Sequence, residues 1–173
     1  RPLTKDQVTA IVAAARSGAR DRRSTGENRA RIYLFLWATA LRTGETSRQL
    51  WRDVDLSERT LRVTAGKVDR GDVIGLPDWL IAEMMRWPRD GARVFPTFMS
   101  RKSVLKDFTA AGITGPGKLH RFRSGAATYL RKCGLDLIDI AKLTRHADLN
   151  TLRKSYIEFD NPQLAEAQRL MAI

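Results

Sequence analysis

The chain has 173 residues, 43% of them hydrophobic, which is enough for one globular domain with a core. Its 31 lysines and arginines against 19 acidic residues give a formal net charge of +12, which is typical of nucleic-acid-binding proteins and of other basic soluble proteins. One cysteine excludes an intramolecular disulfide, two histidines argue against a Cys/His-rich metal site, and no apolar run approaches a membrane span.

The N-terminal quarter is predicted to be helical. Thr4 and Gln7 have the spacing of a capping box, and residues 8–15 place apolar side chains on one helix face. Residues 17–31 are polar and rich in arginine, and we expect a mobile loop there. Residues 32–41 are almost all apolar and predict a buried helix.

A small antiparallel sheet is predicted next. Residues 51–56 and 60–64 alternate between apolar and polar types, as strands do, and a turn separates them. Residues 73–76 form a third candidate strand, stopped by a proline. This arrangement places Lys67 near the tip of a hairpin.

The remaining sequence favours helices. They are predicted at residues 79–87, 100–111, 120–132, 137–143, 150–159 and 164–171, with a Gly/Pro-rich loop at 112–117. The expected fold is therefore α+β and mostly α, a helical domain with one small three-stranded antiparallel sheet.

Several polar residues have types and positions that suit phosphate chemistry. His120 and Arg123 lie three residues apart, so on a helix their side chains point the same way. Arg42 lies at the end of an apolar segment, where an unpaired charge is unfavourable. His146 lies ten residues before Tyr156. Each also has an ordinary explanation, as a solvated basic face, a helix-end arginine or a rim aromatic.

Together these residue types could catalyse attack on a phosphodiester. Arginines and a histidine can stabilise the negative charge on the phosphate, and a tyrosine hydroxyl can be the nucleophile. A lysine or histidine can protonate the leaving oxygen, so this chemistry needs no metal. The pairs Asp53/Asp55 and Asp69/Asp72 could be imagined as magnesium ligands, but turn and strand-end roles explain them better.

Five motifs, in this order, resemble the catalytic domain of the tyrosine recombinases, the phage integrase family. They are Thr39-Ala40-Leu41-Arg42-Thr43-Gly44-Glu45 followed by Trp51-Arg52-Asp53-Val54-Asp55; Ala65-Gly66-Lys67; His120-Arg121-Phe122-Arg123 with Ala127-Thr128 and Gly134; Leu143-Thr144-Arg145-His146; and Tyr156. The resemblance runs from Leu3 to about Phe159.

The chain also departs from the family pattern at a few positions. Ala40 and Arg145 stand where relatives usually have glycine, and Ser124 stands where many have a second histidine. Tyr156 follows His146 by ten residues where nine are expected. We therefore expect Tyr156 on a short, displaced segment when no DNA is bound.

The resemblance implies how the phosphate is bound and attacked. Arg42 and Arg123 would clamp the scissile phosphate, and His146 would donate a hydrogen bond to it. The covalent and proton-transfer steps would then fall to three further residues, namely His120 as the base toward the tyrosine, Lys67 as the acid for the leaving 5′ oxygen, and Tyr156 as the nucleophile. The 3′-phosphotyrosyl link would later be attacked by a 5′ hydroxyl of a partner strand.

The resemblance also implies a setting for this chemistry. The partners would be double-stranded DNA and further protomers, assembled as a tetramer on two DNA sites, with residues 164–171 docked on a neighbour and no membrane. Neither cofactor nor metal is expected, and the location would be the cytoplasm, nucleoid-associated, of a bacterium or of a phage host. Residues 1–173 would be one catalytic domain, with the N-terminal DNA-clamp domain absent from this chain.

Three alternatives stay open. A type IB topoisomerase shares the fold and the covalent chemistry, although the helix predicted after Tyr156 favours exchange between recombinase protomers. A non-catalytic DNA-binding domain, or a decayed integrase, would share the charge, although all six candidate polar residues are retained. A metal-dependent nuclease is the third.

Overall fold

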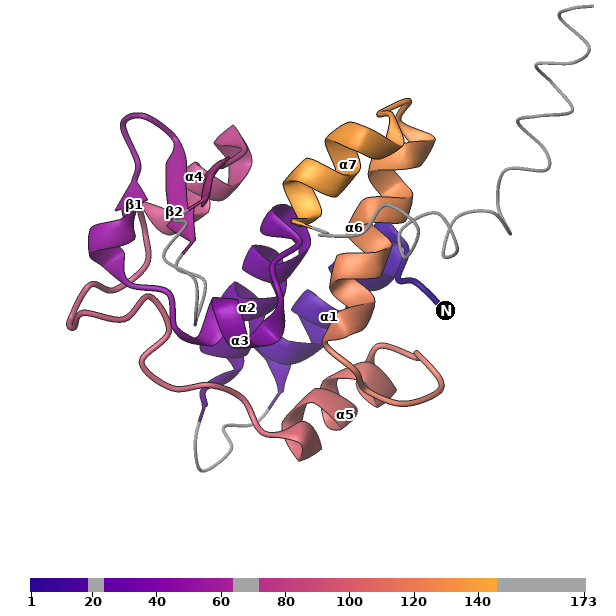
Figure 1. Cartoon of the computed structure of the whole chain (residues 1–173). Coiled ribbons are helices and arrows are strands. Elements are labelled where there is room, and N and C mark those ends of the chain that lie inside the picture. The colour runs from indigo at the N-terminus through magenta and orange to yellow at the C-terminus, as the bar shows by residue number, and fades with distance from the viewer. Residues whose placement is uncertain (19–23, 64–71, 146–173) are drawn as a thin grey trace, which may run out of the picture.

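A computed structural model describes residues 1–18, 24–63 and 72–145, and Figure 1 shows the arrangement of its elements. Most helices lie together on one side, and the small sheet with helix α4 lies on the other. The helices and strands in chain order are α1 (Lys5–Ser17), α2 (Gly26–Thr39), α3 (Thr43–Ser47), the 3-10 helix η1 (Trp51–Asp53), β1 (Val54–Asp55), β2 (Thr60–Val63), β3 (Asp72–Gly75), α4 (Asp78–Met84), α5 (Arg101–Ala110), α6 (His120–Lys132) and α7 (Leu137–Thr144). The predicted fold class, mostly α with one three-stranded antiparallel sheet, is confirmed.

Helix starts follow the capping signals of the sequence. Thr4 and Gln7 form the predicted capping box at the start of α1, and the Ser100 side chain caps α5. Helix α6 has the predicted bounds, and α7 differs from its prediction by one residue at its C-terminal end. The helices predicted at residues 150–159 and 164–171 lie outside the described residues. No helix in the described part of the chain is long and apolar enough to cross a membrane.

The loop predicted at residues 17–31 is partly wrong, because α2 already begins at Gly26. Thr25 caps this helix by accepting a hydrogen bond from the Asn28 backbone N–H. Arg29, which made the segment look solvated, is 3% exposed. Its charge is balanced by a partner far away in the sequence, so local composition is misleading at this point.

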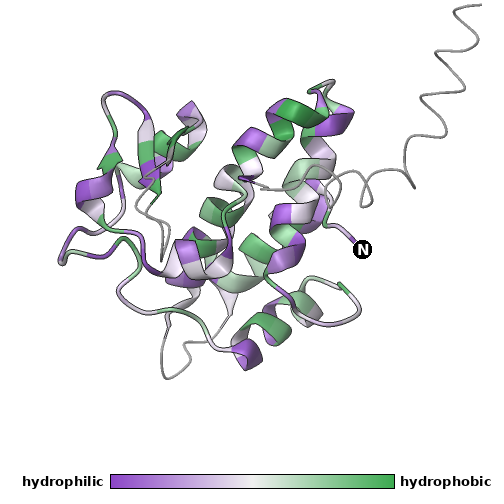
Figure 2. Ribbon diagram, viewed as in Figure 1, coloured by the Kyte–Doolittle hydropathy of each residue, from purple (hydrophilic) through white to green (hydrophobic). Residues whose placement is uncertain are grey.

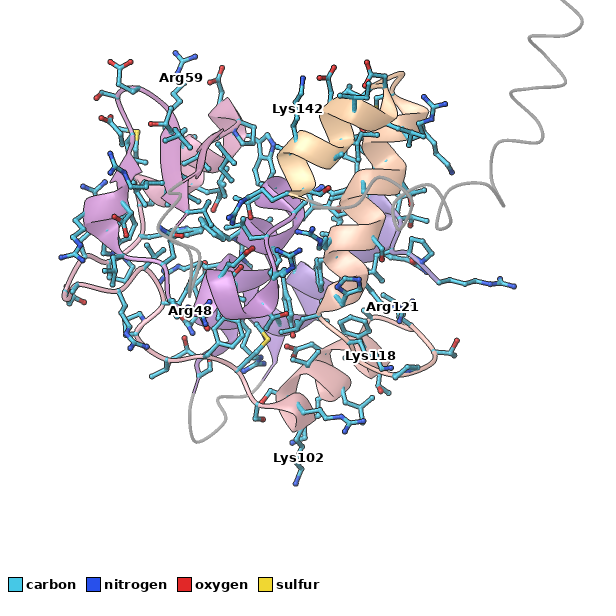
Figure 3. All side chains as sticks on the ribbon, viewed as in Figure 1. Arg48, Arg59, Lys102, Lys118, Arg121 and Lys142 are labelled. Carbon is cyan, nitrogen blue, oxygen red and sulfur yellow. The ribbon has the colours of Figure 1, made fainter. Side chains whose placement is uncertain are left out.

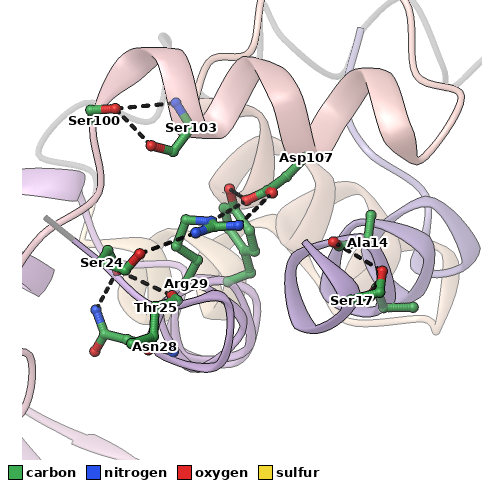
Figure 4. A network of polar contacts seen from close by, with 11 residues as sticks. Ala14, Ser17, Ser24, Thr25, Asn28, Arg29, Ser100, Ser103 and Asp107 are labelled. Atoms are coloured by element: carbon green, nitrogen blue, oxygen red, sulfur yellow. Dashed lines mark hydrogen bonds and ion pairs between the residues drawn. The ribbon is translucent and has the colours of Figure 1, made fainter. Parts of the chain in front are cut away.

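That partner is Asp107 of α5, and Figure 4 shows the network around it. Arg29 Nε and Nη2 lie 2.7 and 3.0 Å from the two Asp107 carboxylate oxygens, and the Tyr33 hydroxyl donates to the same carboxylate at 2.8 Å. Asp107 is also 3% exposed, so both charges are removed from water and depend on each other. The pair ties α5 to α2.

The core extends from the helices α1, α2, α5 and α6 to the sheet and α4. The ring of Tyr33 on α2 stacks on Phe122 of α6 with centroids 5.1 Å apart, and Phe108 of α5 packs edge-on against Phe122. Figure 2 shows that the helices carry both apolar and polar residues, as partly buried helices do. Because Phe122 is fully buried, α6 is fixed in rotation about its axis, and this orients the polar residues of its first turns.

The sheet has the order β1-β2-β3 with both pairs antiparallel. Leu61 in the middle strand pairs with Val54 and with Ile74, so the predicted strand pairing is confirmed. The strand predicted at residues 51–56 is shorter than expected, because residues 51–53 form a 3-10 turn. The Trp51 backbone N–H donates instead to the Ala92 carbonyl, a partner about forty residues later in the chain.

Candidate active site

The corner between α2 and α3 presents Arg42. Helix α2 ends at Thr39 and is capped by Ala40, which has a left-handed backbone with φ of 50°, and Leu41 is buried. The chain then turns into α3, where the Glu45 carboxylate accepts from the Arg42 backbone N–H at 2.9 Å and from its Nη1 at 3.2 Å. The Arg42 side chain is 52% exposed and Glu45 only 8%. A buried carboxylate thus holds an arginine that still reaches solvent.

Arg123 of α6 reaches the same corner from the other side. Its side chain is 3% exposed, and Nη1 donates to the Ala40 carbonyl at 2.7 Å. This carbonyl lies at the C-terminal end of α2, where backbone acceptors lack helical partners and attract cations. The bond brings α6 to the residue that stands two positions before Arg42 in the sequence.

His120 is the first residue of α6 and lies three residues before Arg123. Its pKa is lowered from the ordinary value of 6.5, first by burial and then by the positive charges of Arg123 and Arg42. His120 and Arg123 lie one helical turn apart, and Arg123 in turn contacts the corner that carries Arg42. The site therefore favours a neutral histidine at neutral pH, which can accept a proton.

The structure adds a third cation, Arg145, that sequence reasoning missed. Arg145, directly after α7, places Nη1 3.1 Å from Glu45 Oε1, and its backbone carbonyl accepts from Arg42 Nη2 at 3.4 Å. Glu45 therefore contacts two arginines that are separated by about one hundred residues in the chain. In the sequence, Arg145 stands out only as a departure from the usual glycine of its motif, and nothing there predicts its contact with Glu45.

The other three candidates, Lys67, His146 and Tyr156, lie outside the described residues. Their neighbours in the sequence are described. Strands β2 and β3, between which Lys67 falls in the sequence, form the predicted antiparallel pair. The residue before His146 is Arg145, which contacts Arg42 as described above.

The described cluster is suited to bind an anion. Arg42 and Arg123 carry two positive charges beside a neutral imidazole, and guanidinium groups can donate two parallel hydrogen bonds to phosphate oxygens. Such donors stabilise the charge that develops on a phosphate under attack.

The acidic pairs considered as magnesium ligands are only partly described. The Asp55 carboxylate accepts hydrogen bonds from the Glu58 backbone N–H and from the hydroxyl and backbone N–H of Ser57, and these lower its pKa, so its turn role is confirmed. Among the described residues, no group of three or more His, Cys, Asp or Glu side chains could hold a metal ion.

Comparisons with known proteins identify the family of this chain. The model of the phage integrase family matches residues 1–161. Tyrosine recombinase XerC of Mycobacterium leprae (strain TN) is 30% identical over 169 residues, which cover 86% of this chain and 56% of that protein. The chain thus spans little more than half the length of this curated relative.

Solved structures show the same fold. The XerH site-specific recombinase bound to palindromic difH substrate, in a post-cleavage complex, superposes with a TM-score of 0.76 at 22% identity. That match covers 96% of this chain and 52% of XerH. The catalytic domain of bacteriophage HP1 integrase has a TM-score of 0.69 at 18% identity, covering 92% of this chain and 94% of that domain.

Proposed function

Because this chain belongs to the phage integrase family, we propose that it cleaves and rejoins DNA strands at specific sites through a covalent link to Tyr156. One observation carries this proposal most strongly. Arg42 comes from one motif of the sequence and His120 and Arg123 come from another, yet the fold brings the two motifs together at the end of α2. The near-complete coverage of the HP1 catalytic domain supports the view that residues 1–173 are a catalytic domain.

In the proposed reaction, the two arginines bind the non-bridging oxygens of the scissile phosphate. The Tyr156 oxygen forms a bond to phosphorus and loses its proton to His120, while the bond from phosphorus to the 5′ oxygen breaks. Lys67 gives a proton to that 5′ oxygen, and His146 donates a hydrogen bond to the phosphate. Attack by a 5′ hydroxyl of a second strand reverses these steps and releases the tyrosine.

The lowered pKa of His120 supports its role as the base. A histidine that was already protonated at neutral pH could not accept the tyrosine proton. Burial and the two arginine charges keep it neutral, and the same charges attract the phosphate. One arrangement therefore serves both binding and proton transfer.

Double-stranded DNA is the proposed substrate. The net charge of +12 favours a polyanion, and exposed cations flank the cluster in sequence. Arg48 caps the C-terminal end of α3, and Lys118 lies two residues before the first residue of α6 (Figure 3). The DNA bound to XerH, a protein with this fold, supports the same assignment. The protein would act in the cytoplasm, at the nucleoid, where such DNA lies.

We also propose that protomers assemble as a tetramer on two DNA sites and exchange residues 164–171. An apolar cavity of 420 Å³ between α2, α4, α6 and α7 is a candidate acceptor, lined in part by Trp37, Trp79, Tyr129 and Leu143. Trp79 and Tyr129 are 44% and 38% exposed, which leaves apolar surface for a partner. A chain ending before Leu164 should still bind one DNA site but fail to pair two sites. Unchanged pairing would rule out this exchange.

The test of the proposed reaction is formation of a covalent adduct. The chain is incubated in EDTA with a pool of duplexes that carry randomised core bases and a nick, and protein-linked DNA is isolated after denaturation. The nick lets the cleaved 5′ fragment diffuse away, so the adduct accumulates. Wild type should form the adduct and Tyr156→Phe should not.

Other outcomes favour the alternatives. DNA binding without any adduct from the wild type supports a non-catalytic DNA-binding domain. An adduct together with relaxation of supercoiled plasmid by a monomer supports a type IB topoisomerase. Cleavage that disappears in EDTA supports a metal-dependent nuclease.

A further inference from the structure

Arg145 occupies a backbone conformation that favours glycine. It caps the C-terminal end of α7 with φ of 54° and ψ of 47°, in the left-handed region. Side chains other than glycine are strained there, because the Cβ atom crowds the neighbouring carbonyl. An arginine at this position therefore indicates that its side chain makes contacts which offset the strain.

Those contacts are made with the Arg42 corner. The Arg145 side chain is 11% exposed, and Nη1 lies 3.1 Å from Glu45 Oε1. The same oxygen lies 3.2 Å from Arg42 Nη1, and the other carboxylate oxygen accepts from the Arg42 backbone N–H. The Arg145 carbonyl binds Arg42 Nη2. Arg42 is thus held at three nitrogen atoms by Glu45 and Arg145 together.

The shared carboxylate also matters for charge. Glu45 alone, buried beside Arg42, would cancel much of the positive charge that a phosphate needs to meet. A second guanidinium on the same carboxylate oxygen balances Glu45 and leaves Arg42 a net cation. Because Arg145 contacts Glu45 and is mostly buried, it acts on the phosphate through Arg42.

We propose that Arg145 is a positioning residue for DNA cleavage, which fixes the Arg42 guanidinium through the carboxylate of Glu45 and ties the end of α7 to the start of α3. This inference rests on the proposed function. His146 is the next residue in the sequence, so the same tie also anchors the chain directly before a second proposed phosphate ligand.

The central test compares Arg145→Gly with a matched control, Arg59→Gly. Arg59 also has a left-handed backbone, with φ of 55°, and its side chain forms an exposed ion pair with Asp78. It projects from the β1–β2 turn, away from α3 (Figure 3). Both variants relieve the same backbone strain and remove one guanidinium, but only Arg145→Gly removes the side-chain contact with Glu45 at the Arg42 corner.

The expected result is a split between rate and affinity. In the nicked-duplex assay, Arg145→Gly should slow adduct formation by about tenfold to a hundredfold, the effect of displacing a catalytic group by about 1 Å. Its dissociation constant for the duplex pool should stay within about threefold of wild type, since Arg145 is mostly buried. Arg59→Gly should match wild type in both. An unchanged rate in Arg145→Gly, or equal losses of rate and affinity, would overturn the inference.

A double-mutant cycle with Glu45→Gln tests whether Arg145 acts through Glu45. If it does, the double variant should be no slower than the slower single variant, because both changes disrupt one unit. If the double variant lost rate by the product of the two single losses, Arg145 and Glu45 would have independent roles, and the inference would be contradicted. Arg145→Lys, which keeps a cation but not the guanidinium geometry, should have an intermediate rate and serves where the glycine variant does not fold.

A readout without DNA separates this inference from the proposed function. The pKa of His120 can be followed by NMR of its imidazole in the free chain. If Arg145→Gly frees Arg42, the lowering of that pKa by Arg42 weakens, and the pKa should rise relative to wild type and Arg59→Gly. If wild type forms the adduct and the His120 pKa is unchanged in Arg145→Gly, this inference is refuted alone. If wild type forms no adduct, the proposed function is refuted, and the pKa measurement then shows only whether Arg145 holds Arg42 in place.

Discussion

Replacing Arg123 with alanine should lower the free energy of unfolding slightly and the rate of DNA cleavage strongly, because the side chain both contacts the backbone and, in the proposed function, binds the phosphate. Its Nη1 donates to the Ala40 carbonyl at 2.7 Å, and both residues are buried. A buried acceptor that loses its donor costs about 1–3 kcal/mol. Removal of a buried charge returns part of this amount, so we expect the free energy of unfolding to fall by about 1 kcal/mol.

The catalytic loss should be much larger. Arg123 lies beside His120, where the proposed function places the scissile phosphate. Loss of one donor to such a charged transition state slows reactions by about 10²–10³-fold. Affinity for DNA depends on many phosphate contacts, so the loss of one should raise the dissociation constant by less than about tenfold. The rate of adduct formation at saturating protein, a binding isotherm and a urea titration measure the three quantities.

Arg131→Ala is a suitable control for this prediction. Arg131 lies on the same helix, and its Nη1 also donates to a backbone carbonyl, that of Leu135, at 3.3 Å. Its loss should leave the rate of adduct formation unchanged. If Arg123→Ala reduced rate and affinity by the same factor, Arg123 would be a binding contact only, and the clamp role would be wrong.

Three further predictions concern stability and pH. Asp107→Ala leaves a buried guanidinium without its carboxylate and should lower the free energy of unfolding by about 3–5 kcal/mol. The control Asp139→Ala breaks an exposed ion pair and should change the free energy of unfolding by less than about 0.5 kcal/mol. Urea titrations measure both variants, and similar values would show that burial does not strengthen the dependence of Arg29 on Asp107. The pKa of His120 is lowered below 6.5, so the unfolded chain takes up a proton first as pH falls, and the free energy of unfolding should decrease below pH 6.5 through this group. His120→Gln should flatten the dependence of the free energy of unfolding on pH below 6.5. The same pH dependence in wild type and His120→Gln would refute this prediction. Gly125→Ala would place a Cβ 2.4 Å from a backbone oxygen and should destabilise by about 1–3 kcal/mol, while Gly75→Ala, with nothing within 4 Å, should be neutral or mildly stabilising in thermal melts.

Local signals explain why much of the fold could be predicted from the sequence. A capping residue and the apolar periodicity after it are enough to place a helix start, as at Thr4 and Ser100. The spacing of His120 and Arg123 predicts that their side chains point the same way, because both residues lie within one helical turn. These predictions depend on residues a few positions apart, whose geometry the helix itself sets.

The errors have a different physical origin. Arg29 belongs to a helix because its charge is balanced by Asp107, 78 residues away. Residues 51–53 leave the strand because the Trp51 backbone pairs with Ala92. The contact of Arg145 with Glu45 spans 100 residues and fits no periodic pattern. In each case a tertiary contact determines the local structure, and composition gives no sign of it.

The central claim is that Tyr156 becomes covalently bound to the 3′ end of a cleaved DNA strand. The most direct measurement is mass spectrometry of the isolated adduct after digestion with nuclease and trypsin. Trypsin releases Ser155–Arg169 as one peptide, which contains a single tyrosine. We expect a 3′-linked nucleotide on Tyr156 in that peptide. A nucleotide on another residue, or one linked through its 5′ phosphate, would contradict it.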